Sequence, residues 1–227
     1  MKLKILFLFA SSWLCYIQPG KAQLNLVSGY TGGYYQTEQY NDIIDRYNAS
    51  LDSVRQSFNG INVLNGASVG LNYRINSISL ELLWTERFKI NRQQTINITT
   101  GNESGTSSLL DRYRSISLGL NVHVNKLVIG SSVNYDQFVQ RLREPQADRQ
   151  TITDENNWSV NLHIGFFGKA NRTSAFSIRP YVHLPLSNIN IASLDRRLNE
   201  SNATNIEEDF THFGLSILFY NGPQRNE

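Results

Sequence analysis

Residues 66–88, GASVGLNYRINSISLELLWTERF, contain two runs in which apolar and polar residues alternate, separated by a short polar break. The apolar members of the two runs are Ala67, Val69, Leu71 and Tyr73, then Ile78, Leu80, Leu82 and Trp84. A period of two on both sides of a turn is typical of a β-hairpin with one apolar and one polar face. This hairpin is the unit from which the rest of the fold is predicted.

The same alternation recurs along the chain and predicts eight strands. They cover residues 23–35, 66–74, 78–88, 113–124, 127–136, 158–166, 176–184 and 213–220. Connections after the second, fourth and sixth strands are short, whereas those after the first, third, fifth and seventh are long. Such a chain fits an all-β, eight-stranded antiparallel up-and-down transmembrane β-barrel, with all its long loops on one rim. Pro180 and Pro185 cannot donate to a ladder and predict a bulge or a local edge in the seventh strand.

The first 22 residues have the features of a secretion signal. Lys2 and Lys4 precede an apolar segment, and a small-x-small site ends at Ala22, so the mature chain is expected to begin at Gln23. The alternative, a lipoprotein signal acylated at Cys15, is disfavoured because Leu14 stands where a small residue is required. Removal of the signal removes the only cysteine, so no disulfide is expected. The barrel is assigned to residues 23–221 and a polar C-terminal tail to 222–227.

Residues 41–58 show the one helical pattern, which predicts a short helix in the first long loop. Its apolar stripe consists of Ile43, Ile44, Tyr47, Leu51, Val54 and Phe58. An isolated helix of this length is marginal unless its apolar face is covered. Two hypotheses remain open: the stripe packs on the barrel rim or its own loop, or it docks a partner protein.

Alternation alone does not decide which face points inward, and a soluble lipocalin-like ligand carrier is the competing interpretation. The polar and charged residues that alternate with the apolar ones decide against it. A soluble barrel would have to bury this set of residues against apolar neighbours, which is costly for unpaired charges. Inside a membrane barrel the set is predicted to form a lumenal polar network: Glu81, Arg87, His123, Asp136, His163, Arg179, Tyr181, His183 and His212. Aromatic residues near the strand ends predict girdles, namely Tyr34, Trp84, Tyr135, Trp158, Phe176 and Phe219.

Little in the sequence points to chemistry. The four histidines fall on four strands at different heights, so neither a metal nor another cofactor is expected. A serine hydrolase site at the outer rim would use Ser187, Asp209 and His212, but serine and aspartate are too common in the loops for this to be diagnostic. The net charge of +2 gives no reason to expect a nucleic-acid partner. We therefore predict that the chain is not an enzyme.

The stretch Arg179-Pro180-Tyr181-Val182-His183-Leu184-Pro185-Leu186, together with the signal and the eight strands, resembles the small outer-membrane barrels of Bacteroidetes, the PorT-like group. The architecture is also similar to OmpA/OmpX-type barrels. The resemblance implies location in the Gram-negative outer membrane and, as in some members of that group, an accessory role in a secretion or surface complex. Expected partners are outer-membrane lipid and another outer-membrane or surface protein. The runner-up function is an outer-membrane enzyme acting on lipid or peptide at the outer rim.

Overall fold

The computed structural model describes residues 22–51, 54–96 and 103–224 and shows a closed barrel. The predicted signal lies outside the described residues, apart from Ala22. Eight antiparallel strands form the barrel: β1 (Ala22–Tyr35), β3 (Val63–Ile75), β4 (Ile78–Ile96), β5 (Glu103–Val124), β6 (Leu127–Arg143), β7 (Gln150–Lys169), β8 (Ser174–Pro185) and β11 (His212–Asn221). Each pairs with its sequence neighbours in the barrel, and β1 closes the sheet against β11. The predicted all-β up-and-down topology is confirmed.

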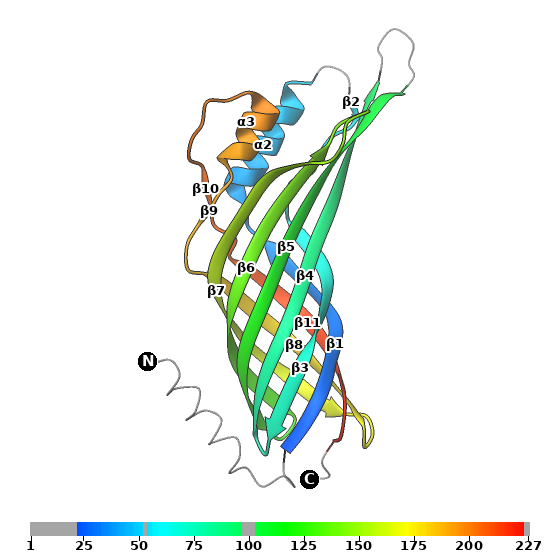
Figure 1. Cartoon of the computed structure of the whole chain (residues 1–227), viewed down its shortest axis with the longest axis vertical. Coiled ribbons are helices and arrows are strands. Elements are labelled where there is room, and N and C mark those ends of the chain that lie inside the picture. Colours follow the sequence, from blue (N-terminus) through cyan, green and yellow to red (C-terminus); the bar gives the residue numbers. More distant parts are fainter. Residues whose placement is uncertain (1–21, 52–53, 97–102, 225–227) are drawn as a thin grey trace, which may run out of the picture.

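Short turns join the strands at the end where both β1 begins and β11 ends (Figure 1). Asn76 and Asn125 adopt positive φ angles of 53° and 55° in the two-residue turns β3–β4 and β5–β6. Asparagine tolerates this left-handed conformation better than most residues, and two-residue hairpins favour it. Gly222 and Gln224, from the predicted tail, donate backbone hydrogen bonds to Thr173 and Arg172 in the third short turn.

The apolar parity faces outward. Leu80, Leu120, Leu162 and Leu215 expose 49%, 50%, 49% and 42% of their surface, whereas their polar neighbours Glu81 and Asn121 are buried. Five of the six predicted girdle residues, all except the half-buried Phe176, belong to the same exposed apolar set. The outside of the lower barrel is therefore an apolar band, and its interior is polar.

Four strands continue well beyond the barrel and form a curved wall on one side of the long-loop end (Figure 1). These strands, β4 to β7, are 17 to 22 residues long. The sequence predicts polar loops after the third and fifth strands, at about 89–108 and 141–156. Both predictions are wrong over most of their length, because the ladders run on through these segments. Above the band each face of these strands mixes polar with apolar residues, such as Leu109 and Leu142 inside and Ile90 outside, so the regular alternation that marks a strand in the sequence is lost there.

Two helices and two short strand pairings fill the concave side of the wall. They are α2 (Glu38–Ala49) and β2 (Val54–Gln56) in the first long loop, and β9 (Ile189–Asn190), α3 (Ala192–Asn199) and β10 (Glu207–Glu208) in the last. β2 pairs with the upper part of β4, and β9 pairs with β10. We call α2, α3 and the β9–β10 pair the cap. Among the described residues, no helix combines the length and apolarity needed to cross a bilayer.

The expectation for the seventh strand is also corrected. β8 lies between β7 and β11 and is not an edge, and its register with β7 is the same on both sides of Pro180. The β7–β8 ladder instead omits the pairing at Pro180 and resumes at Ile178. On the other side Pro180 stands opposite Leu215. The missing donor is thus accommodated by a local gap in one ladder.

Candidate functional site

The lower half of the lumen is crossed by an ion pair between opposite walls. Arg179 of β8 donates from Nη1 and Nη2 to the two carboxylate oxygens of Glu81 of β4, at 2.7 and 3.2 Å. Tyr220 donates to the same carboxylate at 3.1 Å and also contacts the guanidinium, and Ser177 accepts from Arg179 Nε at 3.0 Å. Because β4 and β8 are four strands apart in a ring of eight, the pair fixes the width of the barrel.

A second cluster closes the upper half of the lumen. Arg87 donates to the Tyr35 hydroxyl at 2.7 Å and contacts Nε2 of His212, and its guanidinium lies 5.6 Å from the Tyr181 ring centroid. His212 stacks on His183 with 4.3 Å between ring centroids. Nε2 of His183 in turn lies 3.2 Å from the Asp136 carboxylate. The cluster links β1, β4, β6, β8 and β11 by polar and ring contacts.

The remaining two histidines lie apart from this cluster. Nε2 of His123 is 3.0 Å from the Ser79 hydroxyl, and Nε2 of His163 is 2.8 Å from Oδ1 of Asn121. The structure therefore stacks two of the four predicted lumenal histidines and gives the other two separate polar partners. Within the described part of the chain, no group of three or more His, Cys, Asp or Glu side chains is arranged to hold a metal ion.

Between the two clusters the lumen retains a cavity of about 50 Å³, lined by Glu81, Arg87, His163, Arg179 and Tyr181 among others. A buried water occupies roughly 15 to 30 Å³, depending on the measure. The cavity therefore has room for a few waters and is far smaller than the several hundred Å³ of a small-molecule site.

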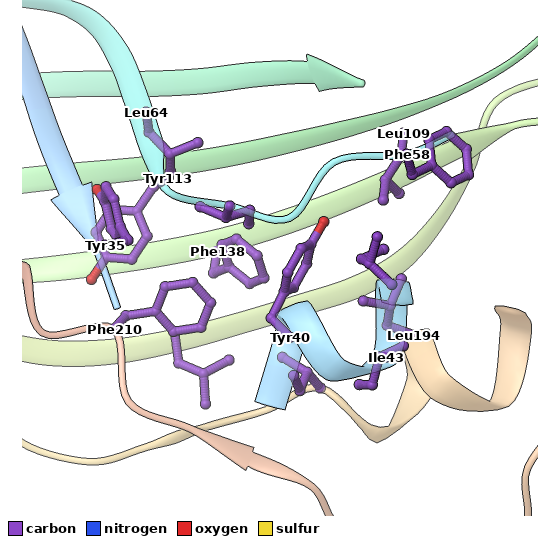
Figure 2. Close-up of a cluster of buried hydrophobic side chains, with 14 of the residues drawn as sticks. Tyr35, Tyr40, Ile43, Phe58, Leu64, Leu109, Tyr113, Phe138, Leu194 and Phe210 are labelled. Atoms are coloured by element: carbon purple, nitrogen blue, oxygen red, sulfur yellow. The ribbon is translucent and has the colours of Figure 1, made fainter. Parts of the chain in front are cut away.

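The cap has an apolar core of its own, built against the inner face of the wall (Figure 2). Tyr40 and Ile43 of α2 and Leu194 of α3 lie beside Phe138 of β6 and Phe210, which follows β10. The Tyr40 hydroxyl donates to both oxygens of Asp111 on β5 at 3.0 Å. This core seals the lumen from the long-loop end.

Polar contacts tie the two cap helices to each other and to the last loop. Arg46 of α2 is 3.0 Å from the Asp195 carboxylate of α3, and Asn199 donates to the Ile43 carbonyl at 3.2 Å. At the start of α2, the Tyr40 N–H donates to Glu208 of β10 at 2.6 Å. Burial raises the pKa of Glu208 to about 7, although the hydrogen bond from Tyr40 opposes the shift.

The predicted docking helix is corrected in extent and in exposure. It ends at Ala49 because Asn48 bonds the backbone N–H and carbonyl of Phe58 and folds the chain back, which the stripe did not reveal. Val54 belongs to β2, and its side chain is not among those described. Ile43, Ile44 and Phe58 are buried in the cap core, while Tyr47 and Leu51 are half-buried. The described side chains of the stripe therefore pack within their own chain and do not form an exposed docking surface.

The predicted hydrolase trio at the rim does not assemble. His212 is fully buried and its Nδ1 lies 2.9 Å from the Phe210 carbonyl. Asp209 accepts from Thr211, and the Ser187 hydroxyl donates to Asn157 at 2.7 Å. Each of the three residues is thus engaged elsewhere.

Several residues of the lumen and the cap were not predicted. Tyr220 and Tyr113 stand on the inward parity of predicted strands, so parity alone could have found them. Tyr35 ends the first strand, where glycines obscure the alternation. Asp111 and Glu208 lie in segments expected to be loops, and no sequence signal places them near Tyr40.

No family model and no curated protein matches this chain. Solved structures that are similar to it include neisserial surface protein A, with 7% identity over 88% of this chain and 97% of that one, at a TM-score of 0.47. Ail, the attachment invasion locus protein of Yersinia pestis, has 8% identity over 89% and 98%, at 0.45. The outer membrane protein OprG from Pseudomonas aeruginosa has 12% identity over 90% and 98%, at 0.44.

Proposed function

We propose that this chain is an integral outer-membrane β-barrel without enzymatic activity, which presents its wall and cap outside the cell for interaction. The observation that supports this most is the inversion of polarity around the barrel. Large apolar side chains, Leu80 and Leu120 among them, are about half exposed on the outside, while charged groups such as Glu81 and Arg179 are buried inside. Exposed apolar side chains of this kind are stable against the hydrocarbon of a bilayer, whereas their exposure to water is unfavourable.

The long-loop end is assigned to the cell exterior. In bacterial outer-membrane barrels the turns on the periplasmic side are short and the extracellular loops are long. The wall, the cap and the long loops then face outward from the cell, and the short turns at Asn76 and Asn125 face the periplasm.

A ligand carrier and an enzyme fit the structure less well. A carrier needs an internal cavity, and the space between Arg87 and Arg179 is about 50 Å³. The Asp136–His183 pair is the arrangement most like catalytic machinery, but both side chains are fully buried. A substrate at the rim has no access to them.

The accessory role implied by the PorT-like resemblance is part of this proposal. Stoichiometric co-purification of an outer-membrane or surface protein from native membranes would support it. Exposed residues of the cap helices, such as Asp42 on α2 and Arg196 on α3, are suitable positions for photo-crosslinkers, because their side chains point away from the cap core.

The membrane assignment is tested by placing a charge on the apolar band. Leu120→Arg is expected to cost about 2 to 4 kcal/mol of stability in the bilayer and to lower the yield of heat-modifiable folded protein. Thr151→Arg, at an exposed position of β7 beyond the band, is the matched control and should fold like the wild type. A wild-type chain that stays monomeric and folded without detergent, or equal behaviour of the two variants, would contradict the assignment.

A further inference from the structure

Arginines gather on the outward face of β4, β5 and β6, directly beyond the apolar band. The antiparallel register sets them in rows across the strands: Arg92 stands opposite Ser108, which stands opposite Arg143. Arg114 stands opposite Glu86, and Arg112 stands opposite Phe88. We call this surface the arginine wall and define it by Arg92, Arg112, Arg114, Arg141 and Arg143 of these strands, together with Arg149 in the connection between β6 and β7.

The lower and upper parts of the arginine wall differ in their charge balance. Glu86 pairs with both Arg112 and Arg114, at 2.9 and 3.3 Å. Across the described part of the chain, Arg92, Arg141, Arg143 and Arg149 form no ion pair with an acidic side chain. The upper part therefore carries unneutralised positive charge.

Three of these arginines converge on a groove. Arg92, Arg143 and Arg149 line a hollow of about 420 Å³ together with Ile90, Thr106, Ser108 and the turn 144–146. Glu144 is the acidic residue among the described ones that line it, and its carboxylate is bound by Arg197 at 2.7 Å. Guanidinium groups present donors in a fixed fork that matches phosphate and carboxylate oxygens. The groove thus offers an anion several donors, beside the apolar side chain of Ile90.

Two arginines of the wall, Arg112 and Arg141, stand beside apolar side chains that point outward but are buried. Leu110 and Val139 point outward yet are only 5% and 4% exposed, and their cross-strand neighbours are Arg141 and Arg112. Aliphatic stems of arginine commonly cover apolar residues while the charged group stays in water.

The position of the arginine wall indicates which anion it meets. On β5 the outward apolar run ends at Ile116, opposite Trp84 of β4, with Arg114 two residues further along and Ser108 eight. On β4 the exposed side chains of Phe88 and Ile90 continue above Trp84, among the arginines. With a rise of about 3.3 Å per residue and a strand tilt near 40°, these rows lie roughly 5 to 20 Å beyond the band. The Arg114 row, at about 5 Å, lies at the depth of lipid head groups. The row of Arg92 and Arg143, at roughly 20 Å, lies above that depth, where a lipid with a large saccharide head group still reaches the side of the barrel.

We propose that the arginine wall binds the anionic, phosphorylated saccharide head group of an outer-leaflet glycolipid, lipopolysaccharide, with Arg92, Arg143 and Arg149 as its principal donors. The inference rests on the proposed function, since it requires the band to lie in the outer membrane. It adds a defined lipid site to the side of the barrel, separate from the cap and the lumen.

The test compares detergent-solubilised wild type with the triple variant Arg92→Gln/Arg143→Gln/Arg149→Gln. Native mass spectrometry and a lipid titration give the dissociation constant for lipopolysaccharide. Each basic residue near an anionic lipid surface contributes about fivefold, so three substitutions should weaken binding roughly a hundredfold. Lys126→Gln/Arg172→Gln, which removes exposed cations at the short-turn end, is the control and should bind like the wild type. The three arginines are exposed and unpaired, so the triple variant is expected to fold, which heat-modifiability verifies.

The ligands tested distinguish the sources of the anion. Dephosphorylated lipopolysaccharide should bind the wild type as weakly as intact lipid binds the triple variant. Equal affinity of wild type and triple variant for lipopolysaccharide would overturn the proposal. So would inorganic phosphate binding as tightly as the lipid, or heparin binding through the same arginines when lipopolysaccharide does not. If the wild type needs no detergent, the membrane assignment fails, and the same ligand series in buffer still measures the anion site separately.

Discussion

The ion pair across the lower lumen should be the largest single electrostatic contribution to the stability of this barrel. Glu81 and Arg179 are about 95% buried, meet through two hydrogen bonds and share Tyr220 as a third partner. Removing one member of a buried pair leaves an uncompensated charge and costs about 3 to 5 kcal/mol. Glu81→Gln is therefore expected to lower the free energy of unfolding by that amount.

A double-mutant cycle separates the pair from its surroundings. In Glu81→Gln/Arg179→Met no charge is left unpaired, and the loss should fall to about 1 to 2 kcal/mol, well below the sum of the single variants. The surface pair Glu144–Arg197, with both side chains more than 40% exposed, is the control, and Glu144→Gln should cost at most about 1 kcal/mol.

Urea unfolding in detergent micelles, followed by tryptophan fluorescence, measures these free energies. Trp84 and Trp158 sit on the outside of the band and leave the detergent on unfolding. The reasoning is refuted if Glu81→Gln costs no more than Glu144→Gln, or if the double variant is as unstable as the two single losses combined.

Three further predictions concern the cap and the pairing of β3 with β4. Because burial raises the pKa of Glu208 from 4.5 to about 7, the docked cap holds a proton that the undocked carboxyl releases. The free energy of cap docking should therefore become more favourable by up to roughly 3 kcal/mol as pH falls from 8 to 5. Slower hydrogen exchange in α2 measures this change, and Glu208→Gln should remove most of the pH dependence. Phe210→Ala should destabilise the cap by about 3 to 5 kcal/mol and speed exchange in α2, while leaving the heat-modifiability of the barrel unchanged. Gly66→Ala would place its Cβ 1.7 Å from the Glu86 carbonyl oxygen, so β3 and β4 must separate locally and the unfolding midpoint in urea should fall; a midpoint equal to wild type would contradict that contact.

The sequence predicts the barrel well because the outer face of its lower part is continuously apolar while the inner face is polar. Wherever the outside meets the apolar band, as at Leu80 and Leu120, the period of two is visible and the strand is found. Beyond the band apolar and polar residues no longer alternate regularly, so the sequence predicts loops where the structure shows the extensions of β4 to β7. The alternation along each strand also predicts which side chains face the lumen, since Glu81 and Arg179 stand on the inward face.

What the sequence does not predict is which distant groups meet. Nothing in the strand pattern pairs Glu81 with Arg179, 98 positions later, or Tyr40 with Asp111. Similarly, the sequence predicts no helix at α3, because its three buried apolar side chains span less than two turns. These contacts depend on strand order and register, which a single chain of alternating residues does not specify.

The cap joins the two ends of the chain, and this sets the timing of its assembly. Ile43 near the start is covered by residues around Leu194, about 150 positions later, so the apolar face of α2 stays uncovered until the last long loop has folded onto it. Closure of β1 against β11 falls in the same late step. The docked cap therefore forms only when the chain is in place from β1 to β11.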